Sequence, residues 1–345
     1  MTGIQRRTFL GTMAGMGLAM HGLAATPIKL GIDLFSLRTQ GWTPFQYLDY
    51  CGAQKVQVVH FSEVRFLGGL DPDNLRKVRQ YAEKLGIEVE IGMKSICPTS
   101  AMFDRKEGTA EEQLARMITA AGIVGSKIVR AVLGSSEDRK GGIERHIESM
   151  VAVLRNTRTR AMDAQIRIAI ENHAGDMQAR ELKTLVEAAG PEFTGVCLDS
   201  GNPLWTIEDP HLTLETLSSY VLTSHVRDSA VWRVPEGAAV AWVRMGEGDV
   251  GIDQYLKDYV RLCPGRALSM ETIVTGPRVF AYEKPEFWAN YKTTPAWEFE
   301  RFVEIAERGK ARGPVPNDKS GAPSRERADL EESLRYTRRI LGVAA

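Results

Sequence analysis

Short runs of apolar and β-branched residues alternate along the chain with longer stretches whose apolar positions recur every three to four residues. Runs of the first kind are typical of buried strands, and stretches of the second kind are typical of amphipathic helices. Helices are predicted at residues 75–85, 110–124, 142–164 and 179–189. Eight strands are predicted at residues 28–33, 55–60, 88–93, 127–132, 167–172, 194–199, 221–226 and 266–271.

Strands that alternate with helices in this way form parallel β-α units. Eight units in about 250 residues is the number that closes a (β/α)8 barrel. A doubly wound open sheet is the alternative, but it normally carries a glycine-rich phosphate-binding turn after its first strand, and residues 31–38 (GIDLFSLR) contain none. The sequence therefore predicts an α/β fold, a single (β/α)8 TIM barrel over residues 25–280.

Residues 281–345 are less regular and are predicted to be a C-terminal extension. Residues 284–300 are rich in aromatic side chains, and residues 310–325 have the Pro, Gly, Lys and Ser content of a loop. Residues 328–341 are predicted to form a final amphipathic helix that ends before Gly342. Three tryptophans, Trp42, Trp205 and Trp242, are expected in loops that follow strands, where we interpret them as packing residues.

The first 24 residues have a different character from the rest of the chain. Arg6 and Arg7 precede Phe9 and Leu10, and a mildly apolar, Gly-rich run without an acidic residue follows. This order resembles a twin-arginine export signal, which the export machinery reads and which is then removed. A disordered basic N-terminus is the alternative. The resemblance implies a periplasmic or otherwise exported protein, and phosphorylated metabolites are scarce in that location.

Charge and composition exclude several classes of protein. The 44 Lys and Arg residues balance 44 Asp and Glu residues, so the chain has no positive excess for binding nucleic acid or an anionic membrane. It also lacks the run of about 18 apolar residues that a membrane-spanning helix needs. The four cysteines are far apart and form no CxxC pair, which argues against a disulfide framework and a thiolate zinc site. The expected partner is a small-molecule carbohydrate, and formation of a homo-oligomer stays open.

The last four predicted strands each end on a residue that can bind a metal ion: Glu171, Asp199, His225 and Glu271. The carboxyl ends of barrel strands converge on one mouth, so these side chains are expected to meet. Three buried carboxylates repel one another and lose hydration, and a divalent cation removes that conflict. Singly, an acid after a strand often caps the next helix and a histidine is often a core residue. Four such residues in succession favour a metal site.

Five segments extend this pattern: IENH at 170–173, LDSGN at 198–202, SHVRD at 224–228, GEGDV at 246–250 and ME at 270–271. They resemble the xylose-isomerase-like barrel superfamily, in particular its sugar isomerase/epimerase branch, over nearly all of the chain after the signal. The resemblance implies one divalent metal ion bound by Glu171, Asp199, His225 and Glu271. It also implies that Glu171 and Glu271 act as acid and base. Mn²⁺ is the ion expected first, with Mg²⁺, Co²⁺ and Zn²⁺ as alternatives.

We therefore expect a metal-dependent isomerase or epimerase that removes a proton next to the carbonyl of a non-phosphorylated sugar, keto-sugar or glycoside. A lyase or hydratase acting on 3-keto-glycosides, or a non-catalytic sugar-binding barrel, is the alternative. His60, at the end of the second strand, is expected to contact the substrate. Residues two apart on a strand share a face, so His173 and Arg227 are expected to do the same. Asn202 is expected to hold one of the metal ligands in place.

Overall fold

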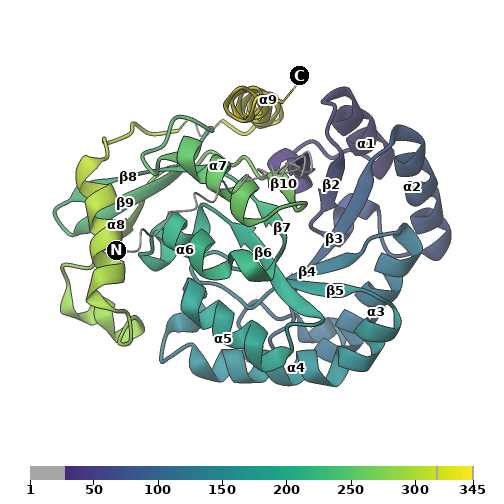
Figure 1. Cartoon of the computed structure of the whole chain (residues 1–345), viewed down its shortest axis with the longest axis horizontal. Coiled ribbons are helices and arrows are strands. Elements are labelled where there is room, and N and C mark those ends of the chain that lie inside the picture. Colours follow the sequence, from purple (N-terminus) through teal and green to yellow (C-terminus); the bar gives the residue numbers. More distant parts are fainter. Residues whose placement is uncertain (1–27, 316–317, 344–345) are drawn as a thin grey trace, which may run out of the picture.

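The structure is a computed structural model that describes residues 28–315 and 318–343. Eight parallel strands form one sheet in the order β10-β1-β2-β3-β4-β5-β6-β7. A bridge between Val226 and Met270 joins its two outer strands, so the sheet closes into a barrel (Figure 1). The strands are β1 (Lys29–Asp33), β2 (Val58–Phe61), β3 (Glu88–Ser95), β4 (Ile128–Val132), β5 (Arg167–Glu171), β6 (Thr194–Asp199), β7 (Val221–His225) and β10 (Ala267–Met270).

Helices follow the strands and cover the outside of the barrel, which confirms the predicted (β/α)8 fold (Figure 1). Local sequence sets where several of them begin. The Thr43 and Thr109 hydroxyls each accept a hydrogen bond from the backbone N–H of the third helical residue, Gln46 or Glu112. The side chain of that residue accepts a hydrogen bond from the threonine backbone N–H in return, which forms a capping box. The helices are α1 (Pro44–Ala53), α2 (Pro72–Leu85), α3 (Ala110–Val124), α4 (Glu144–Asp163), α5 (Ala179–Ala189), α6 (Pro210–Leu217) and α7 (Ile252–Leu262).

A second, antiparallel sheet, which was not predicted from the sequence, lies beside the barrel, and we call it the inserted sheet. Two of its strands come between β7 and β10 in the chain, and the third follows β10. The inserted sheet consists of β8 (Asp228–Val234), β9 (Gly237–Val243) and β11 (Arg278–Phe280), in the order β11-β9-β8. Gly237 begins β9 at a φ of 147°, and a Cβ atom there would lie 2.2 Å from the carbonyl oxygen of Phe280, so the sheet needs glycine at this point. Trp242 therefore lies on β9 and not in the expected loop.

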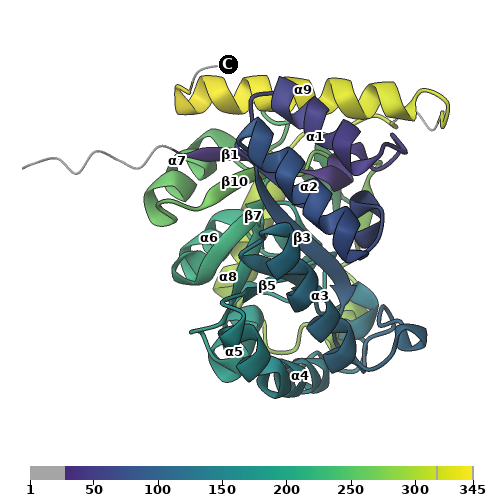
Figure 2. The same ribbon diagram turned by 90° about the vertical axis from the view of Figure 1, so that its right-hand side faces the viewer.

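The two helices of the C-terminal extension have separate places. Helix α8 (Ala296–Arg308) packs on β8 and β9 of the inserted sheet. Helix α9 (Ala322–Leu341) packs against α7 and β10, and the Tyr50 hydroxyl of α1 donates a hydrogen bond to Glu331 of α9 at 3.0 Å. Figure 2 shows α9 running alongside α1 and α7. Helix α9 thus covers the barrel between α7 and α1, the last and the first helices of the surrounding ring.

The predicted export signal, residues 1–24, lies outside the described residues. Among the residues that the structure describes, no helix is both long enough and apolar enough to cross a membrane. The largest apolar cluster fills the space between the barrel strands and the surrounding helices, and two smaller clusters lie on the inserted sheet and among β4 to β7. The polar side chains that concern function are buried at the carboxyl ends of the barrel strands.

Candidate metal centre

The structure brings the four predicted metal-ligand residues together. Glu171, Asp199 and His225 are the last residues of β5, β6 and β7, and Glu271 directly follows β10. One potential ligand atom from each residue lies within 4.8 Å of the corresponding atoms of the other three. All four residues are buried, and Glu271 has the largest exposed fraction, 4%. We call these four residues the ligand cluster.

Strand pairing explains why the ligand cluster forms. Residue Asp199 of β6 is the direct neighbour of His225 on β7 in the parallel register. The backbone N–H of Glu271 donates to the carbonyl oxygen of Val226 at 3.0 Å, which sets the end of β10 beside the end of β7. Because the strands end at the same level, side chains at equivalent positions point into the same mouth.

Two buried arginines balance part of the negative charge. Arg130, from the middle of β4, donates through Nε to Glu171, and Nη2 of Arg227 contacts both Asp199 and Glu271. Burial would raise the pKa of Glu171, but Arg130 and His225 hold it well below its usual range. Burial prevails at Asp199 and raises its pKa to about 6. The carboxylates are thus held in one place by guanidinium groups on either side.

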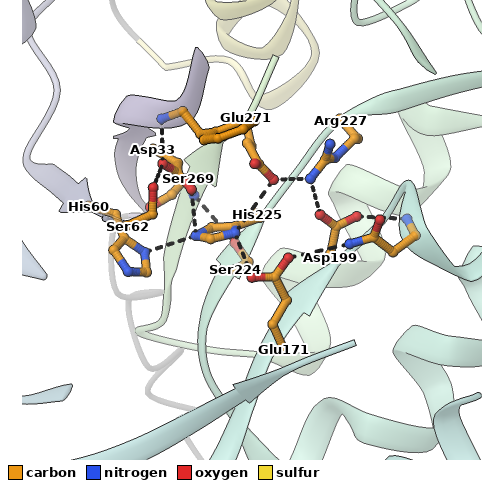
Figure 3. Close-up of polar contacts among 12 residues, drawn as sticks. Asp33, His60, Ser62, Glu171, Asp199, Ser224, His225, Arg227, Ser269 and Glu271 are labelled. Carbon is orange, nitrogen blue, oxygen red and sulfur yellow. Dashed lines mark hydrogen bonds and ion pairs between the residues drawn. The ribbon is translucent and has the colours of Figure 1, made fainter. Parts of the chain in front are cut away.

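The two ring nitrogens of His225 face different surroundings (Figure 3). Nδ1 lies 3.2 Å from Oε2 of Glu171 and 3.5 Å from Oε2 of Glu271. Nε2 lies 3.0 Å from Oδ2 of Asp33 and 2.9 Å from Nδ1 of His60. Burial would lower the pKa of His225, but the surrounding carboxylates raise it well above its usual value. The imidazole therefore separates the ligand cluster from a second polar group inside the barrel.

The other predicted site residues lie around the ligand cluster. Asn202 donates its backbone N–H to Asp199 at 2.8 Å and its side-chain amide to Glu171 at 3.3 Å, so it contacts two cluster residues. His173 is partly exposed, and its Nδ1 lies 2.7 Å from the carbonyl oxygen of Gly134. His60 is fully buried on the Nε2 side of His225. This position favours a role beside His225 over the substrate contact that we expected.

Comparison with known proteins identifies the family to which this barrel belongs. The family model for the xylose isomerase-like TIM barrel matches residues 45–284, more than half of the chain. The chain belongs to the xylose isomerase-like TIM barrel family. Among curated proteins, 3-oxo-isoapionate decarboxylase of Pectobacterium atrosepticum is 27% identical over 207 residues, which are 60% of this chain and 63% of that protein. The chain thus spans less than two thirds of the length of this relative.

Solved structures agree with this xylose isomerase-like fold. An L-ribulose 3-epimerase superposes with a TM-score of 0.59 at 15% identity, covering 92% of this chain and 97% of the epimerase. The IolI protein with a bound zinc atom superposes with a TM-score of 0.54 at 16% identity, covering 81% of this chain and 95% of IolI. At these identities the likeness concerns the fold alone.

The residues of this xylose isomerase-like barrel fit a divalent cation. A metal ion would bind to neutral His225, so it would displace the proton that the raised pKa of His225 indicates. With both histidines neutral, two more negative than positive charges are buried at the site, and one divalent ion would cancel that excess. Carboxylate oxygens and an imidazole nitrogen are ligands that Mn²⁺, Mg²⁺, Co²⁺ and Zn²⁺ accept. The charged groups counted are the carboxylates of Asp33, Glu171, Asp199 and Glu271 and the guanidinium groups of Arg130 and Arg227.

Sequence reasoning missed two charged residues that contact the ligand cluster, Asp33 and Arg130. Asp33 ends β1, so it follows the same rule of an acid at a strand end that identified Glu171. Arg130 is an arginine inside an otherwise apolar strand, IVRAV, which is a signal for a buried charge with a partner. Both signals were present in the sequence, but the ligand set was sought at the ends of the last four strands, and β1 and β4 are not among them.

Proposed function

We propose that the protein is a divalent-metal-dependent enzyme that removes a proton next to a carbonyl group, with epimerisation or isomerisation as the outcome. The observation that carries the proposal is the ligand cluster: three carboxylates and an imidazole, buried within 4.8 Å of one another at the carboxyl ends of four barrel strands. The substrate class is a non-phosphorylated sugar, keto-sugar or glycoside, since the predicted export signal would carry the protein away from sugar phosphates.

Glu171, Asp199, His225 and Glu271 would hold the metal ion, and Mn²⁺ is the ion we propose first. When bound, the ion would polarise the substrate carbonyl and stabilise the negative charge of the enediolate. The protein would supply fixed ligands: Arg130 anchors Glu171, and two backbone N–H groups hold Oδ1 of Asp199 at 2.7 and 2.8 Å. Such fixed ligands need little rearrangement when charge develops in the substrate.

Glu171 and Glu271 are the proposed acid and base. A base must be ionised to accept a proton, and Arg130 keeps Glu171 in that form by lowering its pKa. Glu271 is paired with Arg227 and is the cluster residue with the most exposed surface. If one carboxylate takes the proton and the other returns it to the opposite face, the product is an epimer. Return to the neighbouring carbon gives an aldose–ketose isomerisation.

Arg227 and His173 are the proposed substrate contacts. Nε and Nη1 of Arg227 have no hydrogen-bond partner among the described residues, although the side chain is 2% exposed. Buried donors of this kind are costly unless a ligand accepts from them. A substrate oxygen beside the carbonyl is a suitable acceptor. His173 lies partly exposed at the edge of the site and would contact a more distant hydroxyl group.

A bond-cleaving reaction is the second candidate, and the relative named 3-oxo-isoapionate decarboxylase favours it. In a decarboxylation, the electrons of the broken carbon–carbon bond pass to the neighbouring carbonyl, and carbon dioxide leaves. In a lyase reaction on a 3-keto-glycoside, the proton leaves first and the glycosidic oxygen departs with the electron pair. Both reactions use a stabilised enediolate or enolate, as epimerisation and isomerisation do, so the ligand cluster suits all four outcomes.

The experiment is a screen of free sugars, keto-sugars, oxo-acids and glycosides in deuterated water with added Mn²⁺. The reaction is stopped with a chelator, Mn²⁺ is removed because it broadens resonances, and the products are read by proton NMR. Deuterium at one carbon with an inverted centre indicates epimerisation, and transfer to the adjacent carbon indicates isomerisation. Loss of a substituent or of carbon dioxide indicates cleavage.

Two results would count against the proposal. The first is a metal content below about a tenth of an equivalent in protein purified without chelators, with no rescue by added Mn²⁺, since the site would then bind no ion. The second is binding of a sugar without exchange or turnover, which favours the non-catalytic sugar-binding barrel.

A further inference from the structure

Four side chains form a row beside the ligand cluster, in which two arginines lie over the outer faces of two stacked tryptophans. The guanidinium carbon of Arg227 lies 4.2 Å from the ring centre of Trp242. Trp242 stacks on Trp205 with ring centres 4.4 Å apart and planes inclined by 9°. The guanidinium carbon of Arg278 lies 4.6 Å from the ring of Trp205. We call these four residues the Arg–Trp stack, and it joins the end of β7, the inserted sheet and the segment after β6.

Arg227, the inner end of the Arg–Trp stack, is also confined from its other side. A Cβ atom built on Gly201 would lie 2.5 Å from the aliphatic carbons of Arg227 and 3.0 Å from Nε1 of Trp242. Only glycine lets these two side chains approach the backbone so closely. Arg227 is therefore held between the Gly201 backbone and the face of Trp242, with Nη2 against Asp199 and Glu271.

The inserted sheet supplies Trp242 to this arrangement, and the outer members of the stack support it. Arg278 begins β11 and donates to the Ser136 hydroxyl at 2.8 Å, which ties the outer end of the stack to the segment after β4. Trp205 lies in the short 3₁₀ helix after β6 and fills the space between Arg278 and Trp242. The face of Trp242 is thus fixed before any substrate arrives.

We propose that Trp242 is a positioning residue for Arg227: it fixes the guanidinium plane so that Nη2 stays on the carboxylates while Nε and Nη1 are presented to the substrate. This inference rests on the proposed function. An arginine side chain has many rotamers, and a planar aromatic face restricts the guanidinium group and also attracts its charge. A purely structural Trp242 would affect stability alone, whereas a positioning residue also affects the orientation of Arg227 and the rate of the reaction.

The test compares Trp242→Leu, which removes the aromatic face, with Trp242→Phe, which keeps one. A guanidinium group over an indole ring experiences a ring current, so the Arg227 Nε–H proton should resonate upfield in arginine-labelled protein. The resonance is assigned by its loss in Arg227→Lys. We expect Trp242→Leu to abolish the upfield shift and lower kcat roughly 10- to 100-fold at unchanged metal content. Trp242→Phe should restore most of both.

Trp288→Leu is the matched control, because Trp288 packs against Phe287 and Phe299 in the extension and is not part of the stack. It should lower stability and leave kcat and the Arg227 resonance unchanged. The inference is overturned if Trp242→Leu keeps the shift and kcat, or if the leucine and phenylalanine variants lose activity equally. If the wild-type protein shows no turnover, the proposed function fails, and the NMR comparison still decides whether Trp242 orients Arg227.

Discussion

The two ring nitrogens of His225 face two polar groups that both contain carboxylates but differ in how the carboxylates are paired. On its Nδ1 side, the ligand cluster places carboxylates toward one another, with arginines as their main charged partners. On its Nε2 side, Asp33 and His60 lie at hydrogen-bonding distances of 3.0 and 2.9 Å. Asp33 also accepts from the Phe35 backbone N–H at 2.7 Å and from the Ser62 hydroxyl at 2.5 Å. We call Asp33 and His60 the inner pair.

The ligand cluster is thus suited to bind a cation, whereas the inner pair is suited to fix which ring nitrogen of His225 carries a proton. Burial lowers the pKa of His60 to about 3, so His60 is neutral and can accept a hydrogen bond. Asp33 is ionised, because His225 outweighs the effect of burial and lowers its pKa. If an ion displaces the Nδ1 proton of His225, the remaining Nε2–H would be directed at the inner pair and the lone pair of Nδ1 would face the ligand cluster. An imidazole fixed in this tautomer is the form that binds metal ions.

Glu271→Gln should give the largest effect on the cluster side. The amide keeps the shape of the side chain and cannot accept a proton, so we expect exchange with deuterated water to fall by about 10²- to 10⁴-fold. The measurement is deuterium incorporation at saturating Mn²⁺. Glu247→Gln is the control, since Glu247 is an exposed loop acid paired with Arg244. Unchanged exchange in Glu271→Gln would remove the base role from this residue.

Asp199→Asn should remove the stabilisation that a bound ion gives. An ion present at about 100 times its Kd stabilises the folded state by about 2.7 kcal/mol, which raises Tm by several degrees. The amide keeps Oδ1 for its backbone donors and replaces Oδ2 with an NH₂ group that repels a cation. We expect differential scanning calorimetry to show a Mn²⁺-dependent rise in Tm for the wild type and none for the variant. An equal rise in both would place the ion elsewhere.

Asp33→Asn should test the inner pair and have a smaller effect. Its amide can donate to Nε2 of His225, which would put the proton on Nδ1, where the ion should bind. Changing the partner of a metal-bound histidine typically costs 10- to 100-fold in metal affinity. We therefore expect titration calorimetry to give a weaker Kd for Mn²⁺, while kcat at saturating Mn²⁺ stays near the wild-type value. A loss of kcat with an unchanged Kd would instead place Asp33 in the reaction.

The sequence predicted the cluster side better than the inner pair for a physical reason. Strand periodicity is a local property, so the eight barrel strands and the four residues at their ends could be found, and parallel pairing then brings these residues together. The function of the polar residue at the end of β1 depends on what lies across the barrel. Asp33 was visible as an acid, and only the closed barrel shows that it faces His225.

The inserted sheet is a second part of the structure that the sequence did not predict. Residues 228–243 contain a hairpin signal, a Pro-Glu-Gly turn between two apolar runs. This hairpin lies outside the eight β-α units that a barrel requires, so the barrel pattern did not predict it. Trp242 was accordingly interpreted as a packing residue in a loop. Its stacking on Arg227 joins a strand of the inserted sheet to the segment that follows β7, and such tertiary contacts cannot be inferred from the spacing of residues along the chain.

Ser62→Ala should have the smallest effect, and it tests whether a hydrogen-bond partner of Asp33 influences metal binding. It removes one hydrogen bond to Asp33 and leaves the Phe35 backbone N–H and His225 as partners. A single buried hydrogen bond is worth about 0.5–1.5 kcal/mol, so urea unfolding should show a loss of this size. The Mn²⁺ Kd should change by less than the 10-fold expected at Asp33, because the Asp33 carboxylate keeps its charge 3.0 Å from Nε2 of His225. An effect on Kd as large as that of Asp33→Asn would mean that the orientation of the Asp33 carboxylate, and not only its charge, sets the affinity of the ligand cluster for its ion.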